Sequence, residues 1–227
     1  MLHIVVPPNQ RKQELEQCIL ESGDWVKFST LLETLNFTEK QSEAVLNSKH
    51  NNLLTMAINQ KLPQFVQSLL EAGADPQFVD EQRVPPLNRA CWNRCTIWNG
   101  RSSRKGDTSI PRMLIECGAE VDTLDGNGVT PLYIALLNEN NALWKLLFLT
   151  YDADPFIICE PQRQIPLVSE TCVDLAIRVA VDANNDFSYA LSCSCGDFIK
   201  EVDRKYSKNY FGSVQLEYLD AQPMGHY

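Results

Sequence analysis

The stretch Asp125–Asp154, DGNGVTPLYIALLNENNALWKLLFLTYDAD, decides the fold of this chain. It opens with a G-x-T-P-L-x-x-A pattern formed by Gly128, Thr130, Pro131, Leu132 and Ala135. It closes on Ala153 and Asp154, directly before a proline. A single unit of this kind cannot bury its own apolar face. The pattern therefore predicts similar units on either side.

The pattern returns toward the N-terminus. Leu54 opens a unit that ends in the segment Glu71–Pro76, EAGADP, and Leu87 opens the next unit 33 residues later. Glycine takes the left-handed backbone conformation without strain, so we expect Gly73 to lie directly after a helix. In the later unit Arg83 and Pro85 replace the glycine and threonine of the pattern. That unit ends in LIECGAEVD, residues 114–122.

A 33-residue period and these endings resemble ankyrin-repeat proteins over about Gln10–Tyr206. The resemblance implies an all-α solenoid of about five helix-turn-helix repeats joined by hairpin loops. The expected parts are a degenerate capping repeat at 10–46, repeats at about 47–79, 80–124 and 125–165, a degenerate last repeat at 166–206, and a C-terminal tail at 207–227.

The two ends of the array depart furthest from the pattern. Gln10–Leu35 has the apolar period of two short helices, as expected of a terminal unit that faces water on one side. Near the other end Thr171, Val173 and Ala176 keep the pattern loosely, and 186–206 has the period of a second helix. The tail has no helical period, and we expect it to lie across the last repeat or to be loose.

Two spacings exceed the period. Leu87 and Leu132 are 45 residues apart, and the excess of 12 falls around Arg94–Asp107. Leu132 and Val173 are 41 residues apart, and the excess of 8 falls mostly in a lengthened hairpin at 156–165. The first insertion is rich in glycine and serine, which favours a loop over an extended helix.

The first insertion also concentrates positive charge in an acidic chain. This basic loop contains Arg94, Trp98, Arg101, Arg104 and Lys105. It is compatible with a solvated loop, with docking of an acidic partner segment, or with contacts to nucleic acid through phosphate and stacking. The sequence leaves these three alternatives open.

Members of the resembled family contact partners through hairpin tips and the exposed side of the first helix of each repeat. Carried over by position, this implies a partner-binding set of Ser48, Lys49, Asn59, Gln60, Glu81, Gln82, Val84, Trp92, Asn93, Asn127, Val129, Leu137 and Asn138. Trp92 is either a binding hot spot or a packing residue against the insertion. Leu137 is either a contact or a cover for the neighbouring repeat.

Composition restricts the functional classes. The net charge of −9 disfavours general binding to nucleic acid or anionic membranes, because the average field repels phosphate. No apolar run approaches the roughly 18 residues that span a bilayer, and the first residues do not form a secretory signal. We expect a cytoplasmic or nuclear protein, no membrane partner and no small-molecule substrate.

No catalytic or metal-binding pattern is recognisable. The chain lacks the common nucleotide-binding, nucleophile-elbow and zinc-protease motifs, and its three histidines are isolated in sequence. Its eight cysteines lack CxxC spacing, so we expect buried thiols and no metal site. We expect aspartates near the hairpins to accept local backbone N–H bonds. The sequence predicts no enzyme and no cofactor.

Two functional hypotheses follow. The first is an adaptor or inhibitor that binds another protein through the concave face of the stack. The alternative is a structural or assembly subunit of a larger complex, with the basic insertion 94–107 docking an acidic partner or nucleic acid. Ankyrin arrays serve all these roles, so the fold alone does not choose between them.

Overall fold

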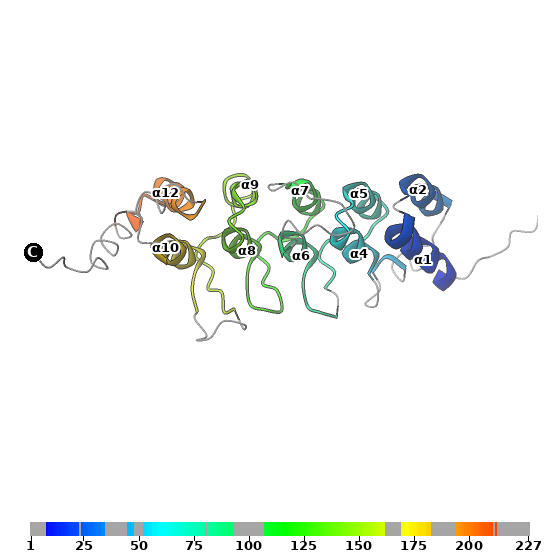
Figure 1. Ribbon diagram of the computed structural model, residues 1–227, viewed down its shortest axis with the longest axis horizontal. Coiled ribbons are helices and arrows are strands. Elements are labelled where there is room, and N and C mark those ends of the chain that lie inside the picture. The colour runs from blue at the N-terminus through cyan, green and yellow to red at the C-terminus, as the bar shows by residue number, and fades with distance from the viewer. Residues whose placement is uncertain are drawn as a thin grey trace, which may run out of the picture. The chain divides into compact units, whose positions relative to one another are not determined.

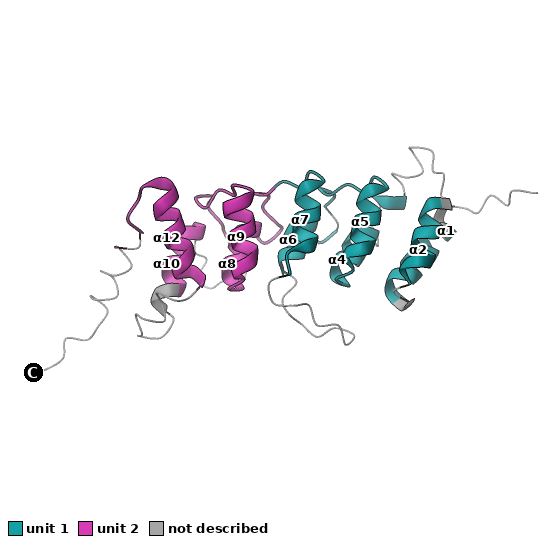
Figure 2. Ribbon diagram, turned by 90° about the horizontal axis from the view of Figure 1, so that it is seen from above, with its two compact units in different colours: residues 1–120 teal, residues 121–227 magenta. Residues whose placement is uncertain are grey.

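The computed structural model (Figure 1) describes residues 8–22, 24–34, 45–47, 52–79, 81–92, 107–161, 169–182, 194–210 and 212. Within these ranges every regular element is a helix, apart from an isolated antiparallel bridge between Cys159 and Glu170. The described part of the chain is therefore all-α, as predicted. The chain divides into two compact units, residues 1–120 and 121–227, which Figure 2 colours separately.

Unit 1 is built from successive helix pairs. They are α1 (Pro8–Gln17) with a π-helical turn (Cys18–Ser22), α2 (Trp25–Thr34), α4 (Leu53–Asn59), α5 (Pro63–Glu71), α6 (Pro86–Trp92) and α7 (Ser109–Glu116). Within this unit Figure 1 shows α4 and α6 in one row and α5 and α7 in a second row. Leu54, Leu69 and Leu114 are buried between the helices. Phe28 packs on Phe65 with ring centroids 4.6 Å apart, which joins the first pair to the second.

Unit 2 repeats the arrangement. Its helices are α8 (Pro131–Leu137), α9 (Asn141–Lys145) continued by a π-helical turn (Leu146–Thr150), α10 (Cys172–Asp182) and α12 (Ser194–Tyr206). Trp144 is fully buried and donates its indole N–H to the Ser194 hydroxyl at 2.9 Å. Its ring meets Phe198 edge-on at 5.5 Å. Burial of large aromatic side chains is a main contribution to stability, so these contacts tie α9 to α12.

Glycine ends two second helices, and at Gly73 this confirms the sequence prediction. Gly73 and Gly118 take left-handed backbone conformations with φ of +93° and +101°. After α5, the N–H of Gly73 donates to the carbonyl of Leu70, and the N–H of Ala74 donates to that of Leu69. This pair of bonds satisfies carbonyls that a helix end otherwise leaves without partners. The chain therefore turns sharply out of the helix and into a hairpin.

The starts of the first helices use side-chain caps. Thr130 accepts the N–H of Tyr133 at 3.2 Å at the start of α8, and Asn52 accepts that of Thr55 at 2.9 Å at the start of α4. Such caps contribute about 1 kcal/mol each. Pro85 precedes α6 and has no hydroxyl, so that unit cannot use the threonine cap.

The hairpin before α6 keeps its turn despite losing the glycine of the pattern. Arg83 has φ of +55° and Gly128, at the same place in its own hairpin, has φ of +76°. The left-handed conformation is uncommon for a residue with a side chain. The backbone geometry of the repeat is thus retained at Arg83 under strain.

The two ends of the chain form helices close to those expected. The pair predicted over 10–35 corresponds to α1 and α2. Thr171 and Asp174 cap α10 reciprocally, since each side chain accepts the other's backbone N–H. Of the helix predicted over 186–206, the described part begins at Ser194, and 183–193 lie outside the described residues. The start of the tail folds back on α12, where Tyr210 donates its N–H to Asp203 at 2.7 Å.

The prediction of buried thiols is mostly right. Buried cysteines in the described residues are Cys18, Cys91, Cys159, Cys172 and Cys195. Cys117 is exposed instead, because it caps the C-terminus of α7 where the chain leaves the helix toward solvent. Cys95 and Cys193 lie outside the described residues.

Candidate functional site

Exposed aliphatic side chains recur at one position of the hairpins that follow the second helices. The helices α5 and α7 and the π-helical turn that continues α9 are followed by residues of positive φ, namely Gly73, Gly118 and Asp152. Six residues beyond each of these stand Val79, Leu124 and Ile158, which are 42%, 48% and 61% exposed. A scattered exposed leucine needs no explanation, but the same exposure at the same repeat position does. We call these three residues the hairpin apolar set.

In unit 2 the two hairpins that carry this set run alongside each other. The carboxylate of Asp122 accepts the N–H of Asp154 at 3.1 Å, and the carbonyl of Gly128 accepts the N–H of Glu160 at 2.9 Å. Leu124 and Ile158 lie between these two bonds, together with Phe156, which is 37% exposed. The result is an apolar strip held on two hydrogen-bonded hairpins.

Gly128 is required by this close pairing. A Cβ at Gly128 would approach the Glu160 carbonyl oxygen to 2.6 Å, well inside contact distance. Its positive φ is a second reason for glycine. The glycine of the sequence pattern thus fixes the distance between the two hairpins.

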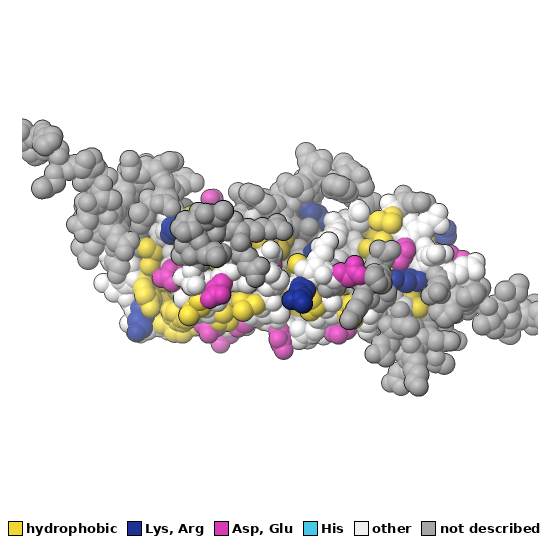
Figure 3. Space-filling model, turned by 90° about the horizontal axis from the view of Figure 1, so that it is seen from below, with side chains coloured by type: hydrophobic (Ala, Val, Ile, Leu, Met, Phe, Trp, Pro, Cys, Tyr) yellow, Lys and Arg dark blue, Asp and Glu magenta, His cyan; other side chains and the backbone are white. Residues whose placement is uncertain are grey.

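Acidic groups flank the strip. Burial raises the pKa of Asp122, and the nearby charges of Asp154 and Asp152 raise it further, while the hydrogen bond from the Asp154 backbone opposes the rise. Asp152 is mostly exposed and forms an ion pair with Lys205 of α12. On the side to which the hairpins project, Figure 3 shows hydrophobic side chains at the surface beside acidic ones. An apolar partner segment that carries lysine or arginine suits such a surface.

Asp125 and Asp154 accept local backbone N–H bonds, as the sequence analysis expected, whereas Asp122 and Asp152 bind groups that are distant in sequence. Asp125 accepts the N–H groups of Asn127 at 2.8 Å and Val129 at 3.2 Å, and Asp154 accepts that of Phe156 at 2.9 Å. These bonds hold the turns. Within the described residues no cluster of three or more metal-ligating side chains is found.

A buried polar network lies beneath the hairpin that precedes α10. Tyr133 donates its hydroxyl to the Glu170 carboxylate at 2.6 Å, and Arg178 donates to the same carboxylate at 2.8 and 3.1 Å. Glu170 is 4% exposed and also forms the backbone bridge with Cys159. A buried charge is stable only when it is paired and hydrogen-bonded. The network therefore anchors the base of the hairpin that carries Phe156 and Ile158.

Several residues of the predicted partner-binding set are available at the surface. Asn59, Glu81, Gln82 and Leu137 are exposed. The half-buried members are Gln60, Val84, Trp92, Asn127 and Asn138. Trp92 ends α6, and Gln60 and Asn138 cap the ends of α4 and α8.

Val129 does not fit the predicted contact role. Its side chain is 1% exposed, because it turns inward directly before the capping Thr130. It is therefore a packing residue, and we leave it out of the surface. Ser48, Lys49 and Asn93 lie outside the described residues, as do Arg94, Trp98, Arg101, Arg104 and Lys105 of the basic loop.

Sequence reasoning missed the hairpin apolar set. Carry-over by position selected hairpin tips and first helices, whereas Val79, Leu124 and Ile158 lie on the arm of the hairpin before its tip. The signal was present in the sequence, since each of the three stands six residues after the residue that ends a second helix. Periodicity places such residues in register but does not show that they face solvent.

Among the described residues no helix is both long enough and apolar enough to cross a bilayer.

Comparison with known proteins gives two partial matches. The chain is 36% identical over 91 residues to the ARF GTPase-activating protein Git of Drosophila melanogaster, which covers 39% of this chain and 11% of that protein. It is 31% identical over 106 residues to a protein of Rickettsia bellii described as an ankyrin repeat protein, which covers 47% of this chain and 28% of that one. The chain therefore spans less than a third of either relative. No family model matches it.

Proposed function

We propose that this chain is an ankyrin-repeat array that acts without catalysis as a protein-binding module, either an adaptor or an inhibitor. The similarity to an ankyrin repeat protein supports the repeat assignment. The paired helices, the left-handed residues after the second helices and the 33-residue spacing of Leu54 and Leu87 agree with it. Stacked repeats of this kind offer an extended surface for a partner.

The observation that carries the binding role is the hairpin apolar set. Val79, Leu124 and Ile158 expose aliphatic side chains at the same position of three hairpins. Burial of apolar surface contributes about 25 cal/mol per Å² of free energy. A partner that covers these three side chains therefore gains binding free energy from them. In unit 1 the proposed contacts are Val79 with the exposed predicted residues Asn59, Glu81 and Gln82. In unit 2 they are Leu124 and Ile158 with the exposed predicted residue Leu137.

Trp92 belongs to the proposed surface as a candidate anchor. It is half-buried at the end of α6, so it both packs within its unit and presents part of its ring. Truncation to alanine is expected to weaken partner binding by more than ~1 kcal/mol if Trp92 is a hot spot. A lower melting temperature with unchanged binding would instead identify it as a packing residue.

The alternative is a structural subunit of a larger complex, held by the acidic surface and the aromatic residues at the start of the tail. Phe156 packs on Tyr206 at 5.0 Å and on Tyr210 at 6.4 Å. Because this cluster already binds the tail to the hairpin within unit 2, it offers less surface to a partner than a loose tail does. We therefore favour the adaptor or inhibitor role.

The test removes the apolar character of the strip without touching the core. Replacing Leu124 and Ile158 together by serine is expected to weaken capture of the partner at least about tenfold, because two exposed aliphatic contacts are lost. Leu149→Ser is the matched control, since Leu149 is 46% exposed on the turn that follows α9. Equal effects of the two variants, or none from the double variant, would refute the assignment.

A further inference from the structure

A second surface lies on unit 1, away from the hairpins. A groove of about 680 Å³ runs between α5 and α7. Figure 2 shows these two helices side by side within the unit. Among the described residues the groove is lined by α5, by α7, by the two residues that precede α7 and by Cys117, which caps α7. It is separate from the hairpin apolar set and from the predicted contact residues.

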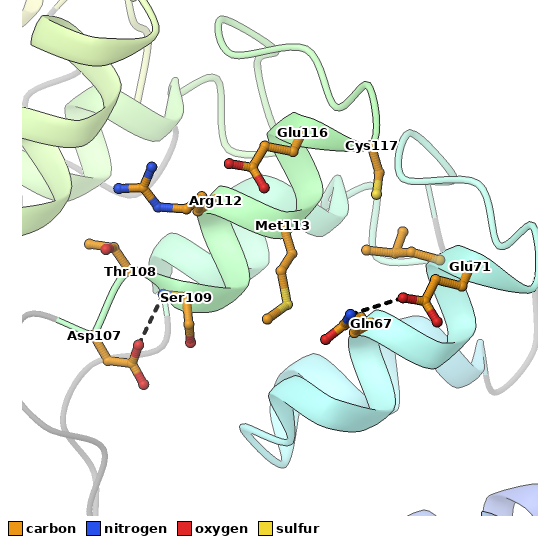
Figure 4. A pocket seen from close by; sticks show the side chains of 10 residues that line it. Gln67, Glu71, Asp107, Thr108, Ser109, Arg112, Met113, Glu116 and Cys117 are labelled. Atoms are coloured by element: carbon orange, nitrogen blue, oxygen red, sulfur yellow. Dashed lines mark hydrogen bonds between the residues drawn. The ribbon is translucent and has the colours of Figure 1, made fainter. Parts of the chain in front are cut away.

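The groove has an apolar centre. Met113 of α7 and Leu70 of α5 are both partly exposed in it. Figure 4 shows Met113 pointing between the two helices, toward Gln67. Methionine is flexible and polarisable, and it adapts to apolar side chains of different shape. The centre of the groove therefore suits an aliphatic side chain of a ligand.

Its two ends carry negative charge. Glu71 stands at the α5 end, where its carboxylate accepts a 2.9 Å bond from Gln67. Asp107 stands at the opposite end and accepts the N–H of Ser109 at 2.9 Å at the start of α7. Figure 4 places Met113 between these two acids. Glu116 adds a third carboxylate to the lining, against a single guanidinium from Arg112.

The size and lining indicate a peptide. α7 has eight residues, and a helix of that length spans about 12 Å. About four residues of an extended chain cover the same distance. Pockets for small molecules are lined mostly by apolar and aromatic groups. This groove has no aromatic side chain among its lining residues, and most of those residues are polar or charged and surround the apolar centre.

We propose that the groove between α5 and α7 binds a short basic segment of a protein, in which an aliphatic side chain meets Met113 and flanking lysine or arginine residues meet Glu71 and Asp107. Charge complementarity of this kind sets the register and the association rate of a peptide. The surface is independent of the proposed hairpin surface, so one array can hold two partner segments.

Cys117 supplies the readout. It is exposed and lines the groove. Its alkylation rate therefore reports whether the groove is covered. The probe is a synthetic peptide of about eight residues with alternating lysine and leucine, and the comparison peptide has glutamate in place of lysine. Mass spectrometry of the Cys117 peptide separates its alkylation from that of the other cysteines.

The lysine–leucine peptide is expected to slow alkylation of Cys117 in the full chain, and the glutamate peptide is not. Replacing Glu71 by glutamine and Asp107 by asparagine removes both charges and keeps their hydrogen-bond acceptors. In this double variant the lysine–leucine peptide should slow alkylation of Cys117 about fivefold less, or weaker still, than in the parent chain. Glu33→Gln is the control, because Glu33 is exposed on α2 outside the groove. It removes a charge without changing the groove and should leave protection unchanged.

Four results would overturn the proposal. Protection that is equal with the acidic peptide, or equal in the double variant, would show that charge does not select the ligand. Protection that grows with protein concentration in the absence of peptide would show that a second copy covers the groove. Alkylation of the free chain that speeds up when Arg101 and Arg104 are replaced by glutamine would show that the basic loop covers it. Loss of hairpin-dependent partner capture leaves this groove test unaffected, so the two proposals fail separately.

Discussion

The hydroxyl of Tyr133 donates a 2.6 Å hydrogen bond to the carboxylate of Glu170, and both side chains are buried in unit 2. Tyr133 stands on α8, and Glu170 stands 37 residues later, directly before α10. Tyr133 stands at the first variable position of the T-P-L-x-x-A pattern. Its hydrogen bond couples this position to a second residue, the acid that pairs with the tyrosine.

Replacing Tyr133 by phenylalanine tests this coupling. The variant keeps the ring and removes the hydroxyl, so within the described part of the chain Glu170 retains only Arg178 as a side-chain donor. Loss of one hydrogen bond to a buried charge is expected to lower the free energy of unfolding by about 1–3 kcal/mol. Urea denaturation measures this change in the free energy of unfolding. Tyr206→Phe, at an exposed tyrosine, is the control and should change stability by less than about 0.5 kcal/mol.

The hydrogen bond between Tyr133 and Glu170 also predicts that the free energy of unfolding depends on pH in the alkaline range. Burial raises the pKa of Tyr133, and the hydrogen bond and negative charge of Glu170 raise it further. The unfolded chain ionises this tyrosine near pH 10, whereas the folded chain keeps it neutral. The stabilisation is thus complete below about pH 10 and is lost as pH rises above it, by up to ~1.4 kcal/mol per pH unit. Denaturation at about pH 9 and pH 11 should show a smaller loss in Tyr133→Phe than in the parent chain. An equal loss would contradict the assignment.

Alanine substitutions at Gly128 and Gly118 distinguish the cost of backbone strain from the cost of a close contact. Both have positive φ, but only a Cβ at Gly128 meets another group, the Glu160 carbonyl at 2.6 Å, whereas a Cβ at Gly118 meets nothing within 4 Å. Gly118→Ala is therefore expected to cost about 1 kcal/mol from the left-handed conformation. Gly128→Ala should cost at least about 1 kcal/mol more, because the two hairpins must also move apart. Thermal melting of both variants checks the order, and a larger loss in Gly118→Ala would disprove it.

Substitutions at Asp122 test the hydrogen bond that joins the two hairpins. Its carboxylate accepts the Asp154 N–H, while burial and, in addition, the nearby acids raise its pKa. Asp122→Asn keeps the acceptor and removes the repulsion, so we expect stability to rise by a few tenths of a kcal/mol, and by more at low salt. Asp122→Ala removes the acceptor and should lower stability by about 1 kcal/mol. Denaturation of the two variants at two salt concentrations distinguishes these effects. A loss in Asp122→Asn comparable with that in Asp122→Ala would rule out the repulsion.

Much of the fold could be predicted because each repeat carries local signals. Gly73 after a helix, Pro63 at the first position of α5 and Thr130 as a cap all follow from backbone chemistry within a few residues. The left-handed Arg83 could not be predicted in this way, since its own chemistry disfavours that conformation. There the rest of the repeat imposes the geometry.

The surface was harder to predict than the fold. Val129 and Leu124 are both aliphatic residues of one hairpin, but Val129 is buried and Leu124 is 48% exposed. Which of the two faces water depends on the neighbouring hairpin, which is distant in sequence. The groove at Met113 also depends on the spacing of α5 and α7, which no local pattern encodes.

Site-specific photocrosslinking tests the central claim, that the hairpins of this array bind a protein partner. A photoreactive amino acid is placed at Ile158 in one variant and at Leu149 in another, since both side chains are exposed in unit 2 and only Ile158 belongs to the hairpin apolar set. We expect a discrete adduct with the co-purified partner from position 158 and none from position 149. An adduct from position 149 alone, or equal adducts from both positions, would contradict it.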